Sequence, residues 1–215
     1  MYLVAEQKCP YCHKSLPKEP KKGALCGGCK KSFRVVTRPS DKQKVIVKEE
    51  EYAGFQFYNN LIRFYPTEKD FYKSIDSTTR ELRSKFGREP QEADVLWGVA
   101  NHLLQEKMKS GDLDILQQVY FEMAFYLHQK GKPNFSIQKA SQEMLLRYYK
   151  KINYCKKVEI LATDESCDVC KMQEKKTFTI EEALKKMPLP AKCKLKINKK
   201  APDGWCGCTY LPVLD

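Results

Sequence analysis

The sequence lacks long apolar runs and is poor in histidine. No apolar run approaches the ~18 residues that a membrane helix requires, so we expect no membrane-spanning segment and no membrane partner. The start, MYLVAEQKCPYC, does not place a basic stretch before an apolar one, so we expect no secretory signal. Both absences favour a cytoplasmic protein, in which disulfides are rare and cysteine pairs more often bind metal. The chain has 3 His against 10 Cys.

Charge and cysteine divide the 215 residues in the same way. Residues 1–48 hold twelve Lys/Arg and three Asp/Glu, residues 49–150 hold fourteen and fifteen, and residues 151–215 hold thirteen and nine. The formal charge of +12 therefore lies at the two ends, which also contain every cysteine. A hydrophobic content of 42% is sufficient for a folded core and argues against disorder throughout. We predict a zinc module at 1–38, a charged linker at 39–50, a helical domain at 51–152 and a Cys-rich tail at 153–215.

The first end contains two C-x-x-C pairs, formed by Cys9, Cys12, Cys26 and Cys29. Two such pairs supply four thiolates in tight turns and complete a tetrahedral shell around one zinc ion. Together with the short strand expected at 32–36, the pattern resembles small zinc-ribbon modules of the "CPxC…CxxCxKxF" kind over residues 7–38. About 30 residues cannot bury an adequate core alone, so the metal is also expected to fold this segment. We expect Gly27 and Gly28 to supply positive φ angles beneath the metal.

Basic residues decorate this module. They can contact nucleic-acid phosphates without reading base sequence, because lysine is a point charge rather than a bidentate donor. A solvated surface and a protein interface are the alternatives. The candidate nucleic-acid-binding residues are Lys8, Lys14, Lys21, Lys22, Lys30, Lys31, Arg34 and Arg38. His13 is an alternative metal ligand, although four cysteines already suffice.

The middle of the chain changes to a helical period. Thr67 and Asp70 form a capping pair, Gly87 ends a helix, Asp112 and Asn134 begin helices, and a break falls at 131–133. Five helices of about 14–20 residues with short turns predict antiparallel hairpins in a bundle or short solenoid. The crowded aromatics near residue 55 favour core packing over a partner groove. The apolar stripe positions are Phe55, Tyr58, Leu61 or Ile62, Tyr65, Phe71, Ile75, Leu82, Phe86, Ala93, Leu96 or Trp97, Ala100, Leu103 or Leu104, Met108, Leu116, Val119 or Tyr120, Met123, Leu127, Ile137, Ala140, Met144 and Tyr148.

The tail carries a C-x-x-C pair and a C-x-C pair. We expect a strand at 157–161, a short helix that starts with a Thr179–Glu182 capping box, and a strand from about residue 205. Gly207 lets both sulfurs of the C-x-C pair face one ion. The predicted second zinc shell is Cys167, Cys170, Cys206 and Cys208, with Cys193 as a reserve ligand and Cys155 buried. Reduced buried thiols or a redox pair are the alternatives.

The tail also resembles the C-terminal motif of phage Mu F-like head-morphogenesis (minor head) proteins, over residues 145–215. That motif has a strand, a "T-x-D-x-x-C-x-x-C" step, a "D-G-K-x-F" step, a proline-rich turn and a terminal "C-x-C". The matching residues are Thr163, Asp164, Cys167, Cys170, Lys176, Phe178, Pro188, Pro190, Cys206 and Cys208. The chain departs from it at Glu174-Lys175, in lacking a His before the C-x-C, and in a basic insert from Lys194 to Asp203. The resemblance implies a phage-derived structural role.

The predicted fold is mainly α with small β zinc modules: an N-terminal zinc ribbon, a central antiparallel helical bundle or short solenoid, and a C-terminal α+β zinc-binding tail. The predicted function is a non-enzymatic, bacterial, zinc-binding adaptor that holds two zinc ions and binds a protein partner or nucleic-acid backbone. The alternative is a phage-related head-morphogenesis protein. We expect no catalytic residues and no small-molecule substrate, because catalytic zinc keeps an open position and often uses His or a carboxylate.

Overall fold

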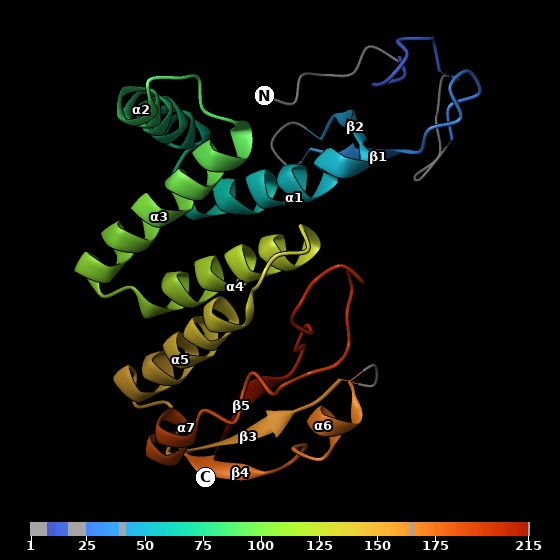
Figure 1. Cartoon of the computed structure of the whole chain (residues 1–215). Coiled ribbons are helices and arrows are strands. Elements are labelled where there is room, and N and C mark those ends of the chain that lie inside the picture. The colour runs from blue at the N-terminus through green and yellow to red at the C-terminus, as the bar shows by residue number, and fades with distance from the viewer. Residues whose placement is uncertain (1–7, 17–24, 39–41, 164–165, 215) are drawn as a thin grey trace. The chain divides into compact units, whose positions relative to one another are not determined.

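A computed structural model of the chain describes residues 8–16, 25–38, 42–163 and 166–214 (Figure 1). The chain forms two compact units, Met1–Val99 and Ala100–Asp215. The boundary falls inside helix α3 (Glu92–Ser110). The structure is mostly helical, with a small antiparallel sheet and a cysteine cluster in each unit, as the sequence predicts. The finer four-part division stays a prediction.

The first unit contains a two-stranded hairpin. Strand β1 (Phe33–Thr37) pairs antiparallel with β2 (Lys44–Lys48), with Phe33 opposite Lys48 and Thr37 opposite Lys44. The segment expected as a charged linker therefore contains a strand, which extends the β module. The alternation of apolar residues explains this, because Val45 and Val47 are both buried and pack with Phe55.

Four helical segments follow the hairpin. The short 3₁₀ turn η1 (Glu49–Glu51) leads into α1 (Tyr52–Leu61), then η2 (Ile62–Phe64) and α2 (Glu68–Phe86). The backbone N–H of Asp70 donates to Thr67 Oγ1 at 3.2 Å, and Gly87 ends α2 at φ 65°, so both predicted helix boundaries are confirmed. Phe55, Phe57 and Tyr58 are buried, which supports core packing.

The second unit contains an antiparallel helix pair. Helix α4 (Leu113–Gln129) begins at Asp112, whose carboxylate accepts from the N–H of Ile115 at 3.4 Å. Helix α5 (Phe135–Lys151) runs back along α4, since Lys151 Nζ donates to the Gly111 carbonyl at 2.7 Å (Figure 1). Whether all the helices form a bundle or a solenoid stays a prediction. None of the helices in the described residues is both long enough and apolar enough to cross a lipid bilayer.

Part of the predicted apolar stripe is wrong. Phe86 is 57% exposed at the last turn of α2, Met108 is 54% exposed near the end of α3, and Ala93 is exposed in the first turn of α3. On α5 the buried face is shifted and mostly polar, with Leu146 as its apolar member. Ser141 Oγ donates to the Gln117 carbonyl at 2.9 Å, and Gln142 Nε2 donates to the Cys208 carbonyl at 3.3 Å. These bonds compensate the burial of polar groups, which an apolar pattern cannot reveal.

The tail forms a three-stranded antiparallel sheet in the order β4-β3-β5. The strands are β3 (Lys157–Leu161), β4 (Thr177–Thr179) and β5 (Thr209–Val213), and two short helices accompany them, α6 (Asp168–Lys171) and α7 (Ile180–Lys186). The predicted strand at 157–161 and the Thr179–Glu182 capping box are confirmed. The last strand starts four residues later than expected, because the C-x-C pair precedes it. Val158, Ile160 and Tyr210 form the core with Leu146.

Candidate metal centres

The four N-terminal cysteines converge. Their Sγ atoms all lie within 4.8 Å of one another. The Cys9–Cys29 and Cys12–Cys26 separations are both 3.7 Å. A tetrahedral zinc ion with Zn–S bonds of about 2.3 Å requires sulfurs about 3.8 Å apart. The sulfur quartet thus fits the group that the spacing predicts.

The two C-x-x-C turns have matching hydrogen bonds. The N–H of His13 donates to the Cys9 carbonyl at 3.0 Å, and the N–H of Lys30 donates to the Cys26 carbonyl at 2.9 Å. His13 and Lys30, each directly after the second cysteine of its pair, adopt left-handed conformations at φ 58° and 61°. His13 is exposed and lies outside the sulfur quartet, so the quartet consists of cysteine alone.

The expected positive φ at the two glycines is wrong. Among the described residues the left-handed glycines are Gly87, Gly111 and Gly131, and not Gly27 or Gly28. A Cβ at Gly28 would lie 2.6 Å from Cδ of the exposed Lys14 side chain, which is flexible enough to move aside, and a Cβ at Gly27 would meet nothing within 4 Å.

Backbone N–H groups face the sulfurs. The N–H of Tyr11 lies 3.5 Å from Cys9 Sγ, and that of Gly28 lies 3.4 Å from Cys26 Sγ. The N–H groups of Cys29 and Gly28 lower the pKa of the Cys26 thiol to about 6. Since the thiolate is the form that binds metal, this arrangement favours metal binding at neutral pH.

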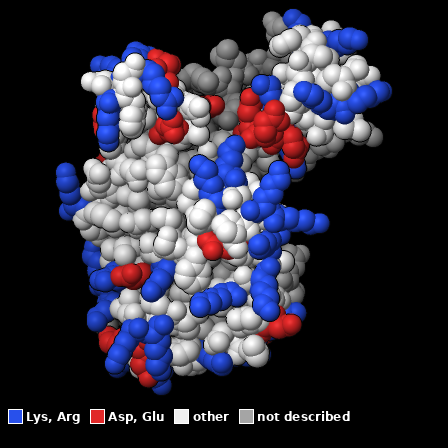
Figure 2. Space-filling model, in the orientation of Figure 1, with Lys and Arg blue, Asp and Glu red and all other residues white. Residues whose placement is uncertain are grey.

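The basic residues of the N-terminal module differ in their surroundings. Arg34 donates twice to Glu49, from Nε at 3.0 Å and from Nη2 at 2.6 Å. Lys31 Nζ lies 4.8 Å from the centre of the Tyr11 ring. Figure 2 shows acidic side chains gathered beside this module near the start of α1. Lys8, Lys14 and Lys30 are exposed and Arg38 is half-buried, whereas Lys21 and Lys22 lie outside the described residues.

The tail brings five cysteines together rather than four. They form two triads that share Cys170, and within each triad all Sγ atoms lie within 4.8 Å of one another. The first triad adds Cys167 and Cys193, whose sulfurs are 3.2 Å apart. The second adds Cys206 and Cys208, and the Cys170–Cys206 separation is 3.8 Å. The structure thus brings the reserve ligand Cys193 into the cluster beside the four predicted ligands.

The tail sulfurs come from several kinds of local structure. Cys167 is the N-cap of α6 and Cys170 lies within that helix, while the C-x-C pair directly precedes β5. Both C-x-C sulfurs approach Cys170, as the Gly207 spacer predicts. Sequence reasoning missed Gly204, where a Cβ would overlap the Cys193 carbonyl. Gly204 is therefore what lets the chain that carries Cys193 approach the C-x-C segment.

The tail sulfurs have divergent proton affinities. The side-chain hydrogen bonds with Cys206 and with the Ser166 hydroxyl, 3.5 Å away, together lower the pKa of Cys208 to about 6 despite its burial. The hydrogen bond with Cys208 and burial both raise the pKa of Cys206. Burial also raises the pKa of Cys170. The coupled pair of Cys206 and Cys208 therefore loses its two protons in separate steps.

The remaining predicted tail residues lie outside the sulfur cluster. Cys155 is half-buried and belongs to neither triad, and burial raises its thiol pKa. Thr163 donates its N–H to Ser166 Oγ at 2.9 Å, so it supports the turn before Cys167. Asp164 lies outside the described residues.

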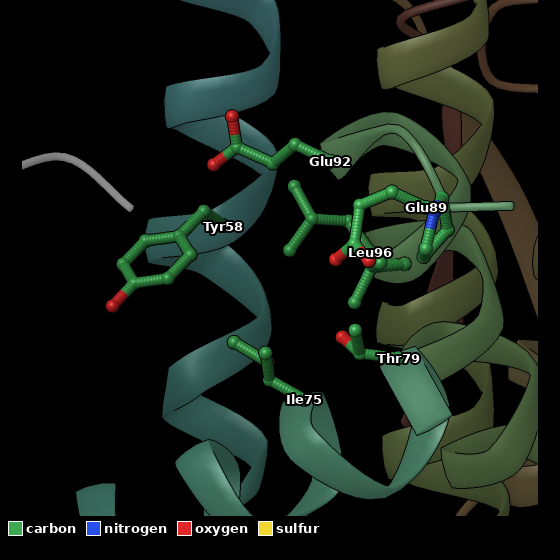
Figure 3. A pocket seen from close by; sticks show the side chains of 8 residues that line it. Tyr58, Ile75, Thr79, Glu89, Glu92 and Leu96 are labelled. Atoms are coloured by element: carbon green, nitrogen blue, oxygen red, sulfur yellow. The ribbon is translucent and has the colours of Figure 1, made fainter. Parts of the chain in front are cut away.

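A separate pocket of about 210 Å³ lies in the first unit, where Tyr58 of α1, Ile75 of α2 and Leu96 of α3 face one another (Figure 3). Of its two acidic residues, Glu89 accepts from Arg83 Nε at 2.7 Å, so its charge is paired, and burial raises the pKa of Glu92. None of the clusters of three or more Cys, His, Asp or Glu side chains found in the described residues lies in this pocket. The two cysteine clusters are the stronger candidate sites.

No protein-family model, curated protein or solved structure matches this chain.

Proposed function

We propose that this chain is a non-enzymatic zinc-binding adaptor of the cytoplasm. It binds a protein partner or a nucleic-acid backbone through two metal-stabilised modules. The observation that carries this proposal is the N-terminal sulfur quartet, whose separations of 3.7 Å match a tetrahedral zinc shell. A module of this size needs the ion in order to fold, so the metal has a structural role.

The composition of both clusters supports a structural rather than a catalytic metal. Structural zinc sites are closed, four-coordinate and often all-sulfur, whereas catalytic sites use three protein ligands and keep one position for water or substrate. The N-terminal quartet already supplies four sulfurs, and Cys9 and Cys26 are buried. The tail cluster offers five sulfurs, which is more than one tetrahedral ion can use.

The test is the metal content of the full chain purified without a histidine tag. We expect two zinc ions per chain, measured by plasma mass spectrometry together with native protein mass. A Cys9→Ser/Cys26→Ser variant should retain one ion, because the tail cluster is intact. A parent protein that holds one ion or none, and that keeps its far-ultraviolet circular dichroism in a strong chelator, would contradict the two-site proposal.

The tail cluster has one sulfur more than the four that a tetrahedral ion binds. We propose that Cys167, Cys170 and Cys206 are constant ligands and that Cys193 and Cys208 compete for the fourth position. Both candidates lie within 4.8 Å of Cys170, which belongs to both triads. The Cys193→Ser and Cys208→Ser variants should each retain two ions, and the double variant should lose the tail ion. Loss of the ion from either single variant would instead identify that cysteine as an obligatory ligand.

The second candidate function is a phage-derived head-morphogenesis protein. It is favoured by the order of the tail elements: β3, then the Cys167–Cys170 step, then β4, the proline-containing turn and the C-x-C pair before β5. This is the order that the resemblance to phage Mu F-like proteins implies. A gene location next to portal and terminase genes would favour this function. A location among host genes would favour the adaptor.

A further inference from the structure

The tail contains a lysine-rich segment that has no acidic residues. Between Glu182 and Asp203 the sequence has seven lysines, no arginine and no acidic residue. Five of these lysines are exposed within residues 192–200, which we call the lysine loop. Figure 2 shows Lys and Arg side chains gathered on the face of the second unit that this loop occupies. The five loop lysines are Lys192, Lys194, Lys196, Lys199 and Lys200.

Neutral groups fix the loop, so that its lysines are left available. The backbone N–H groups of Ile197 and Asn198 both donate to His128 Nε2, at 3.1 and 3.3 Å. Asn198 Nδ2 also donates to the Gln129 carbonyl at 2.7 Å. His128 is fully buried on α4 and burial lowers its pKa, so it serves as a neutral acceptor. Gly131 packs closely against the loop, since a Cβ there would lie 3.3 Å from Lys200 Cβ.

The loop lysines take part in no ion pair within the described part of the chain. The nearest acidic residue in sequence, Asp203, instead accepts from the N–H groups of Asn134 and Phe135 at the start of α5, at 2.8 and 3.2 Å. The only acid next to the loop in sequence is therefore engaged by a helix. Unpaired lysines on a fixed backbone are suited to bind an external polyanion.

An exposed aromatic ring lies beside the loop. The N–H of Trp205 donates to the Leu195 carbonyl at 2.7 Å, and the Trp205 indole packs edge-to-face against Phe121 with centroids 5.4 Å apart. Phe121 is 40% exposed, and Ile197 on the loop is 55% exposed. Bases of a single strand stack on such rings, whereas a duplex keeps its bases stacked on one another.

We propose that the lysine loop and Phe121 form a binding surface for single-stranded nucleic acid. Lysines contact the phosphates as point charges, and Phe121 stacks on a base, so the surface has little base specificity. The exposed ring beside the cations favours a nucleic-acid strand over an acidic protein surface, because bases present flat π faces. This inference rests on the proposed adaptor function and names its partner, and it places the contact in the tail rather than on the N-terminal module.

The test is fluorescence anisotropy of the full, metal-loaded chain with labelled 20-mer oligo(dT), 20-mer oligo(U) and a 20-base-pair duplex. The loop variant replaces four lysines, and the control variant replaces four exposed lysines of α2 and α3, so both lose four charges. The loop variant is Lys194→Gln/Lys196→Gln/Lys199→Gln/Lys200→Gln, and the control is Lys69→Gln/Lys73→Gln/Lys85→Gln/Lys109→Gln.

Both single strands should bind more tightly than the duplex, with affinity falling as salt rises from 50 to 200 mM. Four lost phosphate contacts should lower the salt slope by about 2.8 and weaken binding roughly several hundred-fold at 0.1 M salt, since each contact contributes about 0.7 to the slope. Phe121→Ala should weaken single-strand binding roughly tenfold, whereas Phe86→Ala, which removes an even more exposed ring from α2, should not.

Tighter binding of the duplex, or equal losses in the loop and control variants, would overturn the proposal. So would an absence of nucleic-acid binding at 50 mM salt, which would leave an acidic protein as the partner. Metal content is measured on the same samples. Two bound ions without nucleic-acid binding would refute this inference alone, whereas an absence of metal would refute the proposed function.

Discussion

Asp203 caps a helix that begins 69 residues earlier in the chain. Asn134 is the N-cap residue of α5, but its side chain makes no cap bond and turns instead toward His128, with Nδ2 3.1 Å from Nδ1. The carboxylate of Asp203 replaces it by accepting from the N–H groups of Asn134 and Phe135. Asn134 thus begins this helix, as predicted, but its side chain does not cap it. We predict that Asp203→Ala destabilises the second unit.

The size of the effect follows from these two hydrogen bonds. Hydrogen bonds to charged groups contribute about 1.5–3 kcal/mol each, and a helix N-terminus adds about 0.3–1 kcal/mol for a nearby negative charge. Asn134 is fully buried, so its N–H has no access to water, whereas half-buried Phe135 can recover part of its loss. We therefore expect Asp203→Ala to lower the free energy of unfolding by about 2–3 kcal/mol. Asp203→Asn keeps an acceptor oxygen and should cost about 1 kcal/mol.

The measurement is urea unfolding followed by tryptophan fluorescence. The chain has 2 Trp, so a Trp97→Phe background makes Trp205 the only reporter, and Trp205 packs against Phe125 and His128 in the second unit. The matched control is Asp114→Ala, which removes an exposed acid from the first turn of α4 and should cost about 0.5 kcal/mol. A change below 0.5 kcal/mol for Asp203→Ala would refute the capping argument.

Two further predictions concern the same unit. Because burial lowers the pKa of His128, the unfolded chain binds more protons below the ordinary value of about 6.5, so stability should fall as pH drops below it, by up to about 1.4 kcal/mol per unit. His128→Gln should flatten this slope in urea titrations between pH 7.5 and 5, and an unchanged slope would contradict the neutral acceptor role. Leu146→Ala should cost about 2–5 kcal/mol, because Leu146 is fully buried against the tail sheet. A loss below 1 kcal/mol would show that the tail core does not depend on α5.

Local sequence signals predicted much of this structure. The C-x-x-C turns, the Thr67 and Asp112 caps and the Thr179–Glu182 box depend on residues three or fewer apart, so their geometry is determined within one turn of chain. The strand at 157–161 was equally visible, because its apolar residues alternate.

Long-range pairings could not be predicted in this way. The sequence named Cys193 as a reserve ligand, but the approach of its segment to the C-x-C pair depends on Gly204, which no local pattern signals. The buried polar face of α5 depends on Gln142 bonding the Cys208 carbonyl, 66 residues away. The Asp203 carboxylate likewise accepts a hydrogen bond from the start of a helix that is distant in the sequence. In each case a residue meets a partner from a distant segment, which only the folded chain brings close.

Metal binding and the lysine loop should be thermodynamically linked. Cys193 lies within the loop and Cys206 follows it, and both belong to the five-sulfur cluster around Cys170. The constant ligands Cys170 and Cys206 flank the loop in the sequence, so an ion that they hold closes the segment between them. Without the ion, that closure entropy must be supplied by the anchors at His128 and Asp203.

We therefore predict that stripping the tail ion lowers single-strand affinity in the parent. The loss should be larger in an Asp203→Ala background, since one anchor is already missing, and zinc should restore it in both. The measurement is anisotropy with oligo(dT) before and after chelation, with metal content monitored in parallel. Equal affinity of the metal-free and metal-loaded parent would show that the loop keeps its position through α4 and α5 alone. The ion would then stabilise the β3 sheet without any effect on binding.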